Sequence, residues 1–279
     1  MADGKERVMN KEFWIRLRSS ILILLITLLC FYFGGIALFL MIAVVSVIGM
    51  FELYRVCGIW KTGLAAAGIA GGCLYLEAVY LGWDAWLLLV LILGLMLVIG
   101  TYVFTFPRYQ IEQIAVTVFG ILYIPVMLSY GYRIRTLEGG RILIWLVFLA
   151  ASGSDIMAYC TGILFGKHKL APLLSPKKSV EGSVGGVVGA GLLGLIYALI
   201  FRDSLTGFQH PLLENALLCA VGGRVSQLGD LAASAIKRNK NIKDYSQLIP
   251  GHGGILDRLD SVIPTAPLLY YLIVLLQSR

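Results

Sequence analysis

The sequence predicts an all-α polytopic membrane protein, built as one helical bundle with a polar cavity at its cytoplasmic side. Two compositional observations support this class. Hydrophobic residues make up 58% of the chain and charged residues only 14%, whereas a soluble domain is about half apolar and about a quarter charged. The third observation is that apolar runs of about 20 residues, long enough to cross the hydrocarbon core as helices, recur along the chain. The length of 279 residues leaves no room for a sizeable soluble domain.

Apolar runs of membrane length predict about nine transmembrane helices. The expected spans are residues 13–32, 34–53, 62–82, 85–105, 113–132, 141–164, 183–201, 212–236 and 261–277. We divide them into N-terminal transmembrane helices, residues 1–140, and a C-terminal catalytic region, residues 141–279. Gly185 and Gly189 have the small-residue spacing of closely packed helices, although glycine is abundant in this chain.

Loop charge determines the expected orientation. With the N-terminus in the cytoplasm, the loops 165–182 and 237–260 lie inside, and they carry much of the Lys and Arg, as the positive-inside rule requires. The loop with Arg133, Arg135 and Arg141 disagrees, because it would lie outside. Either the span count is wrong locally or this loop tolerates the exception. The net charge of +7 suits an anionic membrane surface at least as well as an anionic substrate.

Several ionisable residues fall within the predicted spans. Asp155 lies inside the sixth span, where an ionised side chain near the helix centre costs about 2.5–3.5 kcal/mol. The eighth span carries a polar stripe, at steps of three or four residues, formed by Arg224, Gln227, Asp230, Ser234 and Lys237. Such a stripe faces a bundle interior or a wet cavity. It is either an internal salt-bridge stripe, for example between Arg224 and Asp230, or part of a functional site, and the charged loop that follows favours the second.

The segment 234–260 concentrates charge beside a His-Gly-Gly turn. Asp257 and Asp260 are three residues apart and, if helical, project from one face beside Arg258. Together with Asp230 they offer carboxylate oxygens. Carboxylate and phosphate oxygens are the usual ligands of Mg²⁺, so these residues are candidate metal ligands.

The turn itself offers groups for an anion. His252 lacks partners at zinc-like spacing, so we interpret it as a hydrogen-bond or phosphate contact. Gly253 and Gly254 would let backbone N–H groups approach an anion closely. A glycine pair is also typical of an ordinary turn, and it is the neighbouring Asp and Lys residues that favour the anion site.

The segment 174–182 is a second candidate site for phosphate. Ser179 is a predicted N-cap of the seventh span, with Glu181 in the first turn. A helix N-terminus beside Lys177 and Lys178 suits the oxygens of a triphosphate. The alternative is that the two lysines are membrane-surface charges.

The order of these residues resembles the signature of the phosphatidate cytidylyltransferases (CDP-diacylglycerol synthases). The matching positions are Ser234, Lys237, Arg238, Lys243, Asp244, His252, Gly253, Gly254, Asp257, Arg258 and Asp260. Upstream, Asp155, Ala158, Tyr159 and Gly162 match a second motif of that family, and the segment 175–182 matches a third. There Ser179 replaces the usual threonine and keeps its hydroxyl. The resemblance covers about residues 150–262, whereas the N-terminal half contributes only hydrophobicity.

The resemblance implies that CTP and phosphatidic acid react to give CDP-diacylglycerol and pyrophosphate, with Mg²⁺ required. Our hypothesis takes Asp230 and Asp257 as metal ligands, with Asp260 and Asp155 as further candidates. Groups that would neutralise phosphates are Lys177, Lys178, Lys237 and Arg258, with Arg238 and Lys243 serving the lipid phosphate. Residues that would orient these groups are Ser234, Asp244 and His252.

Two other functions compete with this interpretation. A CTP-dependent kinase of a polyprenol lipid also needs CTP, Mg²⁺ and a membrane site, but it releases CDP instead of pyrophosphate. An ion-coupled transporter would spread charge through the membrane depth, whereas here it gathers at one predicted end. The expected partners are CTP, phosphatidic acid and the lipid bilayer, and no nucleic acid. The resemblance also implies a homodimer, and we expect a bacterial inner-membrane protein whose active site faces the cytoplasm.

Overall fold

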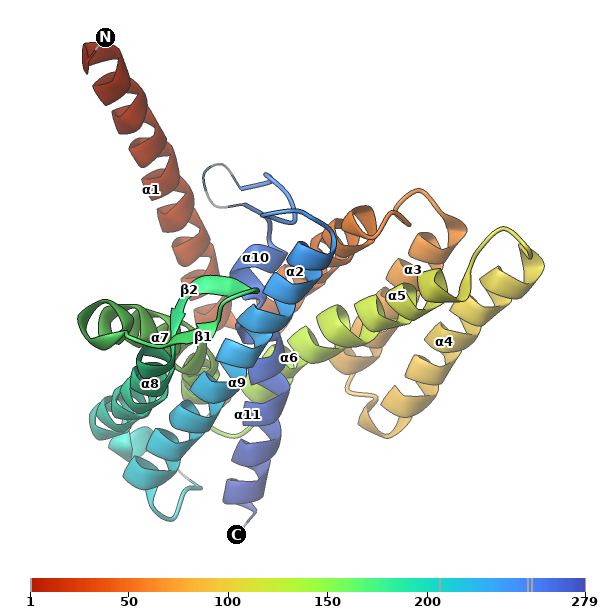
Figure 1. Cartoon of the computed structure of the whole chain (residues 1–279). Helices are drawn as coiled ribbons and strands as arrows, with labels where there is room; N and C mark the ends of the chain where they lie inside the picture. Colours follow the sequence, from red (N-terminus) through yellow and green to blue (C-terminus); the bar gives the residue numbers. More distant parts are fainter. Residues whose placement is uncertain (1, 206, 250, 252, 279) are drawn as a thin grey trace.

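Figure 1 shows the computed structural model of the chain, a bundle of helices with one small β-hairpin. It describes the backbone of residues 2–205, 207–249, 251 and 253–278 and, within these, the side chains of Trp14 and of all residues from Leu17 on. The helices and strands are α1 (Ala2–Phe33), α2 (Gly35–Val56), α3 (Gly63–Tyr80), α4 (Leu87–Phe104), α5 (Ile111–Ile121), α6 (Met127–Thr136), α7 (Gly140–Phe165), β1 (Lys169–Ala171), β2 (Ser175–Ser179), α8 (Val180–Ile200), α9 (Pro211–Asn239), α10 (Leu256–Leu259) and α11 (Val262–Gln277). Short 3-10 turns cover Asp84–Trp86 and Arg202–Ser204, and a π turn, Leu122–Val126, joins α5 to α6.

The predicted class, a helical membrane protein, is confirmed, whereas the count of nine spans is not. Among the described residues, seven helical segments are long and apolar enough to cross a membrane. They are Gly35–Val56, Gly63–Tyr80, Asp84–Phe104, Ile111–Thr136, Gly140–Phe165, Val180–Ile200 and Leu256–Gln277. The other two predicted spans are helical but do not qualify. The apolar part of α1, Leu17–Phe33, is shorter, and α9 carries the polar stripe along its 29 residues.

Helices α7, α8 and α9 pack closely and form the framework of the site. Glycines on α8 permit this approach: Gly185 lies against Thr161 of α7, and Gly189 lies against Met157 of the same helix. A methyl group at Gly194 would lie 2.5 Å from the backbone oxygen of Asn215 in α9. Small residues therefore bring three helix backbones together, as expected for helices that associate within a bilayer.

The β-hairpin lies in the segment that the sequence predicted as a loop. Strands β1 and β2 pair antiparallel, with Lys169 opposite Ser179 and Ala171 opposite Ser175. Because β2 leads directly into α8, the hairpin places Lys177 and Lys178 beside the first turn of that helix.

Contacts between loops distinguish the two ends of the bundle. At one end, Arg55 donates to the backbone oxygen of Tyr245 (3.2 Å), and Arg238 donates to that of Leu174 (3.4 Å). The α2–α3 turn, the hairpin and the loop after α9 therefore meet there. We call this the signature end.

The three arginines that disagreed with the predicted orientation have structural partners at the opposite end. Arg133 pairs with Asp84 at 2.9 Å, and Arg141 lies 4.3 Å from the ring centroid of Tyr32. Arg135 donates to the backbone oxygen of Phe31 (3.1 Å) and so satisfies the last turn of α1. These partners account for the three arginines structurally, and the side of the membrane on which the loop lies stays a prediction.

One hydrophobic core joins residues of both halves of the chain, from Leu38 in α2 to Ile273 in α11. Helix α1 contributes little to this core, since it extends away from the other helices in Figure 1. Its surface carries exposed apolar side chains, such as Leu22 (60% exposed) and Leu29 (54% exposed). An apolar exposed face is what lipid requires of a membrane helix. The division at residue 140 stays a prediction.

Candidate active site

A polar cavity of about 650 Å³ lies between α7, the hairpin, α8 and α9. Its lining residues come from four segments: Asp155, Ala158, Tyr159, Gly162, Ile163, Leu170, Lys177, Lys178, Ser179, Gly182, Ser183, Gln227 and Asp230. Five of the predicted site residues are therefore in one place, Asp155, Lys177, Lys178, Ser179 and Asp230. They come from parts of the sequence as far apart as α7 and α9, so the packing of these helices creates the site.

Asp230 and Lys178 form an ion pair in this cavity. Both side chains are partly open to solvent, with 27% and 26% of their surface exposed. On the same side of α9, the Ser234 hydroxyl lies 3.5 Å from Asp230 Oδ1. The Lys178 Nζ atom itself is buried, so a phosphate would reach this ammonium group only after the lysine side chain moves.

The first turn of α8 forms one edge of the same cavity, which Gly182 and Ser183 line. The predicted N-cap is confirmed, since Ser179 Oγ accepts a hydrogen bond from the Gly182 N–H (3.1 Å). Glu181 in this turn accepts from His168 Nδ1 (2.6 Å) and from the Lys167 N–H (3.1 Å), which ties the hairpin to the helix. The site therefore combines a helix N-terminus with lysines, an arrangement that attracts phosphate.

Three carboxylates are close enough for their charges to interact: Asp155, Asp230 and Asp260. Asp155 Oδ2 accepts from the Ser261 hydroxyl (3.1 Å), and Asp260 Oδ1 accepts from the Ser261 N–H (2.8 Å). Ser261 thus holds two of them from the junction of α10 and α11. No group of three acidic, His or Cys side chains in the described part of the chain is compact enough to hold a metal ion unaided. Oxygen donors fit Mg²⁺, which is commonly bound by one or two carboxylates plus substrate phosphates.

Asp257 occupies a different environment from Asp230. Its Oδ1 lies 2.7 Å from Lys237 Nζ, and only 5% of the Asp257 side chain is exposed. Its Oδ2 accepts from the N–H groups of Tyr245 (2.8 Å) and Gly254 (3.1 Å). These three hydrogen bonds favour a role in organising the loop. The predicted role as metal ligand stays a prediction.

The expectation that Asp257 and Asp260 share one helical face holds only in part. Helix α10 is four residues long, and Asp260 follows it as the C-cap before α11 begins. The break separates their surroundings, since Asp257 contacts Lys237 while Asp260 contacts Ser261. The two carboxylates therefore have different contacts, and their binding of one cation stays a prediction.

The glycine pair forms a turn whose N–H groups are already used. Gly253 has a left-handed backbone (φ 87°), which favours glycine, and its N–H donates to Ile249 O (3.2 Å). The Gly254 N–H donates to Asp257. Their predicted contact with an anion stays a prediction, and His252 lies outside the described residues.

Other predicted residues lie near the signature end. Arg238 contacts the hairpin backbone, whereas Lys243, Asp244 and Arg258 are exposed. Exposed cations at the end of a membrane bundle suit the headgroups of anionic lipids.

The polar stripe on α9 belongs to a buried hydrogen-bond network. Gln227 Nε2 donates to Ser154 Oγ (3.1 Å), while Gln227 Oε1 accepts from Ser183 Oγ (2.5 Å). Arg224 donates to Ser183 (3.0 Å), and Asp230 pairs with Lys178. The alternative pairing of Arg224 with Asp230 is therefore not the one observed. The network connects α7, α8 and α9 at the deep side of the cavity.

Sequence reasoning missed Glu52 on α2. Only 1% of this residue is exposed, and its carboxylate accepts hydrogen bonds from the segment that carries the signature. A lone acidic residue at the end of an apolar span was the available signal, because a buried charge in a membrane protein is costly without partners.

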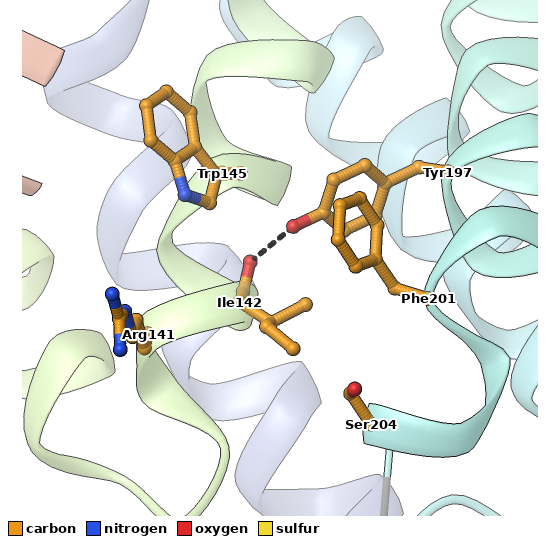
Figure 2. A pocket seen from close by; sticks show the side chains of 6 residues that line it. All are labelled: Arg141, Ile142, Trp145, Tyr197, Phe201 and Ser204. Carbon is orange, nitrogen blue, oxygen red and sulfur yellow. Dashed lines mark hydrogen bonds between the residues drawn. The ribbon is translucent and has the colours of Figure 1, made fainter. Parts of the chain in front are cut away.

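A second cavity of about 420 Å³ lies beside α7 and α8 (Figure 2). Its lining is Arg141, Ile142, Trp145, Tyr197, Phe201 and Ser204. The Tyr197 hydroxyl donates a hydrogen bond to the backbone oxygen of Ile142 (2.9 Å). This lining contains no carboxylate, so the cavity around Asp230 is the better candidate for metal-assisted chemistry.

Together, the apolar helices and the cavity of carboxylates, lysines and a helix N-terminus define an integral membrane protein with a site suited to phosphate groups and a divalent cation. Comparison of the sequence with known families identifies it further. The chain belongs to the cytidylyltransferase family, whose sequence model matches residues 14–276. The predicted resemblance is confirmed.

Several relatives carry the name phosphatidate cytidylyltransferase. The protein of that name from Staphylococcus epidermidis is 33% identical over 266 residues, which cover 93% of this chain and 98% of that protein. The one from Mycobacterium bovis is 36% identical over 170 residues, or 61% of this chain and 54% of the relative. A third, from Synechocystis, is 45% identical over 137 residues, or 49% of this chain and 45% of the relative. The matched regions thus span about half the length of the mycobacterial and cyanobacterial relatives.

Proposed function

We propose that this protein transfers a cytidylyl group from CTP to phosphatidic acid, giving CDP-diacylglycerol and pyrophosphate. The observation that carries the proposal is the cavity in which Asp230, Lys178 and the first turn of α8 meet at the end of apolar helices. Family membership and the names of the relatives support the same reaction. In this proposal the lipid phosphate would reach the site from the bilayer, and the nucleotide would enter from water.

In the proposed reaction an oxygen of the lipid phosphate attacks the α-phosphorus of CTP. The bond from that phosphorus to the bridging oxygen breaks, and its electron pair leaves with pyrophosphate. A phosphate monoester is already largely ionised near neutral pH, with a second pKa of about 6, so no strong general base is needed. The difficulty is to bring two anions together, and positioned cations overcome it.

The lysines and the helix N-terminus of the cavity fit this task. Lys178 and Lys177 would leave their resting positions to bind the triphosphate, and the positive end of the α8 dipole would favour its negative charge. Gln227 and Ser183 would form the polar wall behind the nucleotide. Arg258 and Lys243, which are exposed at the signature end, would bind the lipid phosphate.

The donor set also fits Mg²⁺, which we include in the proposal. Asp230 would hold it, with Asp155 and Asp260 as further candidate ligands whose charges act on the same place, and phosphate oxygens would complete its coordination. Asp257, the other predicted ligand, forms an ion pair with Lys237. Its carboxylate would become free to bind Mg²⁺ if Lys237 bound a phosphate instead. Bound Mg²⁺ supplies charge neutralisation at phosphate oxygens.

The bacterial relatives and the loop charges support a location in the inner membrane with the signature end in the cytoplasm. The homodimer implied by the resemblance belongs to the same proposal, as does the absence of a nucleic-acid partner.

The test is a product analysis with purified protein in detergent, supplied with CTP and Mg²⁺ with or without phosphatidic acid. We expect pyrophosphate and a cytidine-containing lipid, both only when phosphatidic acid is present. Release of free CDP on addition of a polyprenol would instead identify a lipid kinase. Absence of turnover with either lipid would leave transport as the surviving alternative.

A further inference from the structure

Glu52 lies at the signature end of α2, about one turn before the end of the helix at Val56. It is almost completely buried, with 1% of its surface exposed. The sequence analysis gave the N-terminal half of the chain no role beyond hydrophobicity. A buried carboxylate is strongly unfavourable unless hydrogen bonds or charges compensate it, so the partners of Glu52 are informative.

All described partners of the Glu52 carboxylate belong to the loop and helix that carry the signature. Oε1 accepts from the Ser246 hydroxyl (2.5 Å) and from the Ile255 N–H (3.0 Å). Oε2 accepts from the Leu256 N–H (2.9 Å). Both carboxylate oxygens of Glu52 therefore accept hydrogen bonds.

The two N–H groups are those at the start of α10, which have no partner within the helix. The Ile255 side chain at the N-cap position cannot accept a hydrogen bond. Glu52 supplies the missing acceptor from another helix, and its negative charge is stabilised by the helix N-terminus. Glu52 thus determines where the segment Leu256–Gln277 begins relative to α2.

The glycine of the signature turn matches this carboxylate in shape. A methyl group at Gly254 would lie 2.8 Å from both carboxylate oxygens of Glu52. A side chain at position 254 would displace the Glu52 carboxylate from the hydrogen bonds that it accepts. The contact gives Gly254 a structural requirement that comes from α2 and not from its own turn.

The same short segment is held from its other side by α9. Asp257 accepts from the Gly254 N–H and pairs with Lys237, which belongs to α9. Residues 254–257 are therefore clamped between Glu52 of α2 and Lys237 of α9. The position of Asp260, whose charge interacts with Asp230, follows from where this clamped segment ends.

We propose that Glu52 is a positioning residue of the transfer site: its carboxylate fixes the signature segment and thereby the positions of Asp257, Arg258 and Asp260. The kinetic consequences of this inference rest on the proposed function. The hydrogen bonds by which Glu52 holds the segment do not depend on it. Both carboxylate oxygens are required. In Glu52→Gln the amide group must face at least one backbone N–H, whichever way it is turned, and two donors then oppose each other.

The experiment compares Glu52→Gln and Glu52→Asp with the unchanged protein, and uses Glu77→Gln as a matched control. Glu77 lies exposed on α3, away from the signature contacts. Four quantities are measured: kcat and KM with CTP and phosphatidic acid, the number of CTP sites per protein, and hydrogen exchange of peptides that cover residues 246–260 and 150–183.

For Glu52→Gln we expect kcat to fall about 100-fold, the result of losing interactions worth about 2.7 kcal/mol at the transition state. The KM for CTP should change by less than about threefold, and the number of CTP sites should stay the same, because the Asp230 cavity does not include Glu52. Hydrogen exchange should accelerate in 246–260 only. Glu52→Asp keeps both carboxylate oxygens, so its kcat should be about tenfold higher than that of Glu52→Gln. Glu77→Gln should behave as the unchanged protein.

Two results would overturn the proposal. One is a Glu52→Gln protein whose kcat stays within about threefold of normal. The other is a loss of CTP sites in proportion to the loss of kcat, which would mean that Glu52 only maintains the fold. If the unchanged protein shows no cytidylyl transfer, the proposed function fails; unaltered exchange in 246–260 would then still refute the inference, and local acceleration would still support it.

Discussion

The Lys237 ammonium group lies 2.7 Å from Asp257 Oδ1, and only 14% of the lysine side chain and 5% of the aspartate side chain are exposed. The two opposite charges compensate each other as long as both side chains are present. Removal of one member leaves a buried charge without a partner, which typically costs about 3–5 kcal/mol. The pair therefore links the end of α9 to the segment that carries the signature.

Asp257→Asn should lower the melting temperature and abolish most cytidylyl transfer, because Lys237 loses its counter-charge. Lys237→Met should do the same. If the two act as a pair, the double variant should be more stable than the sum of the two single losses predicts, by about 1 kcal/mol or more. Thermal unfolding of the three variants measures this coupling, and additive losses would contradict a pairwise role.

The metal role predicted for Asp257 is checked with the same protein. If Asp257 only positions Lys237, Asp257→Asn lowers kcat while the Mg²⁺ concentration for half-maximal activity stays within about threefold of normal, because the ligand set is intact. A rise of about tenfold in that concentration would instead indicate that Asp257 binds the metal. The measurement is a Mg²⁺ titration of initial rates at saturating CTP.

Asp230→Asn is expected to reduce turnover by about 1,000-fold, since it removes a carboxylate from the cavity and leaves Lys178 without its partner. Asp203→Asn is a matched control, because Asp203 is exposed in the turn Arg202–Ser204 at the opposite end of the bundle. Initial rates of pyrophosphate release measure both. Near-normal turnover of Asp230→Asn would remove this residue from the proposed site.

Local periodicity explains why part of the site could be predicted. The stripe on α9 was visible because helical spacing places Gln227 and Asp230 on one face, and both line the cavity. Ser179 was recognisable as an N-cap because its hydroxyl type and its position before an apolar run are local signals. The class of the fold followed from hydropathy in the same way.

The features that could not be predicted from the sequence depend on contacts between residues that are distant in the chain. Glu52 and Leu256 are 204 residues apart in the sequence, and no spacing rule connects them. The hairpin strands have three and five residues, too few for an alternating pattern. Asp257 and Asp260 were placed on one face by their spacing, but the end of α10 at Leu259 separates their contacts.

Lys178→Met should raise the KM for CTP by about tenfold or more, because an ammonium group that binds a phosphate contributes about 1.5–3 kcal/mol. Lys169→Met is the control from the same hairpin, since Lys169 is exposed and is not among the residues that line the cavity. Binding of CTP without phosphatidic acid should weaken in the first variant alone. An equal effect of both changes would show that general hairpin charge, and not the cavity, attracts the nucleotide.

Ser179 provides a prediction in which stability and binding change together. Ser179→Ala removes the acceptor for the Gly182 N–H, and loss of such a cap costs about 0.5–2 kcal/mol. The first turn of α8 should then fray at the edge of the cavity, so both the melting temperature and the affinity for CTP should fall. Ser179→Thr keeps the hydroxyl and should preserve both. If Ser179→Ala lowered the melting temperature without weakening CTP binding, the N-terminus of α8 would stabilise the fold but would not contact the triphosphate.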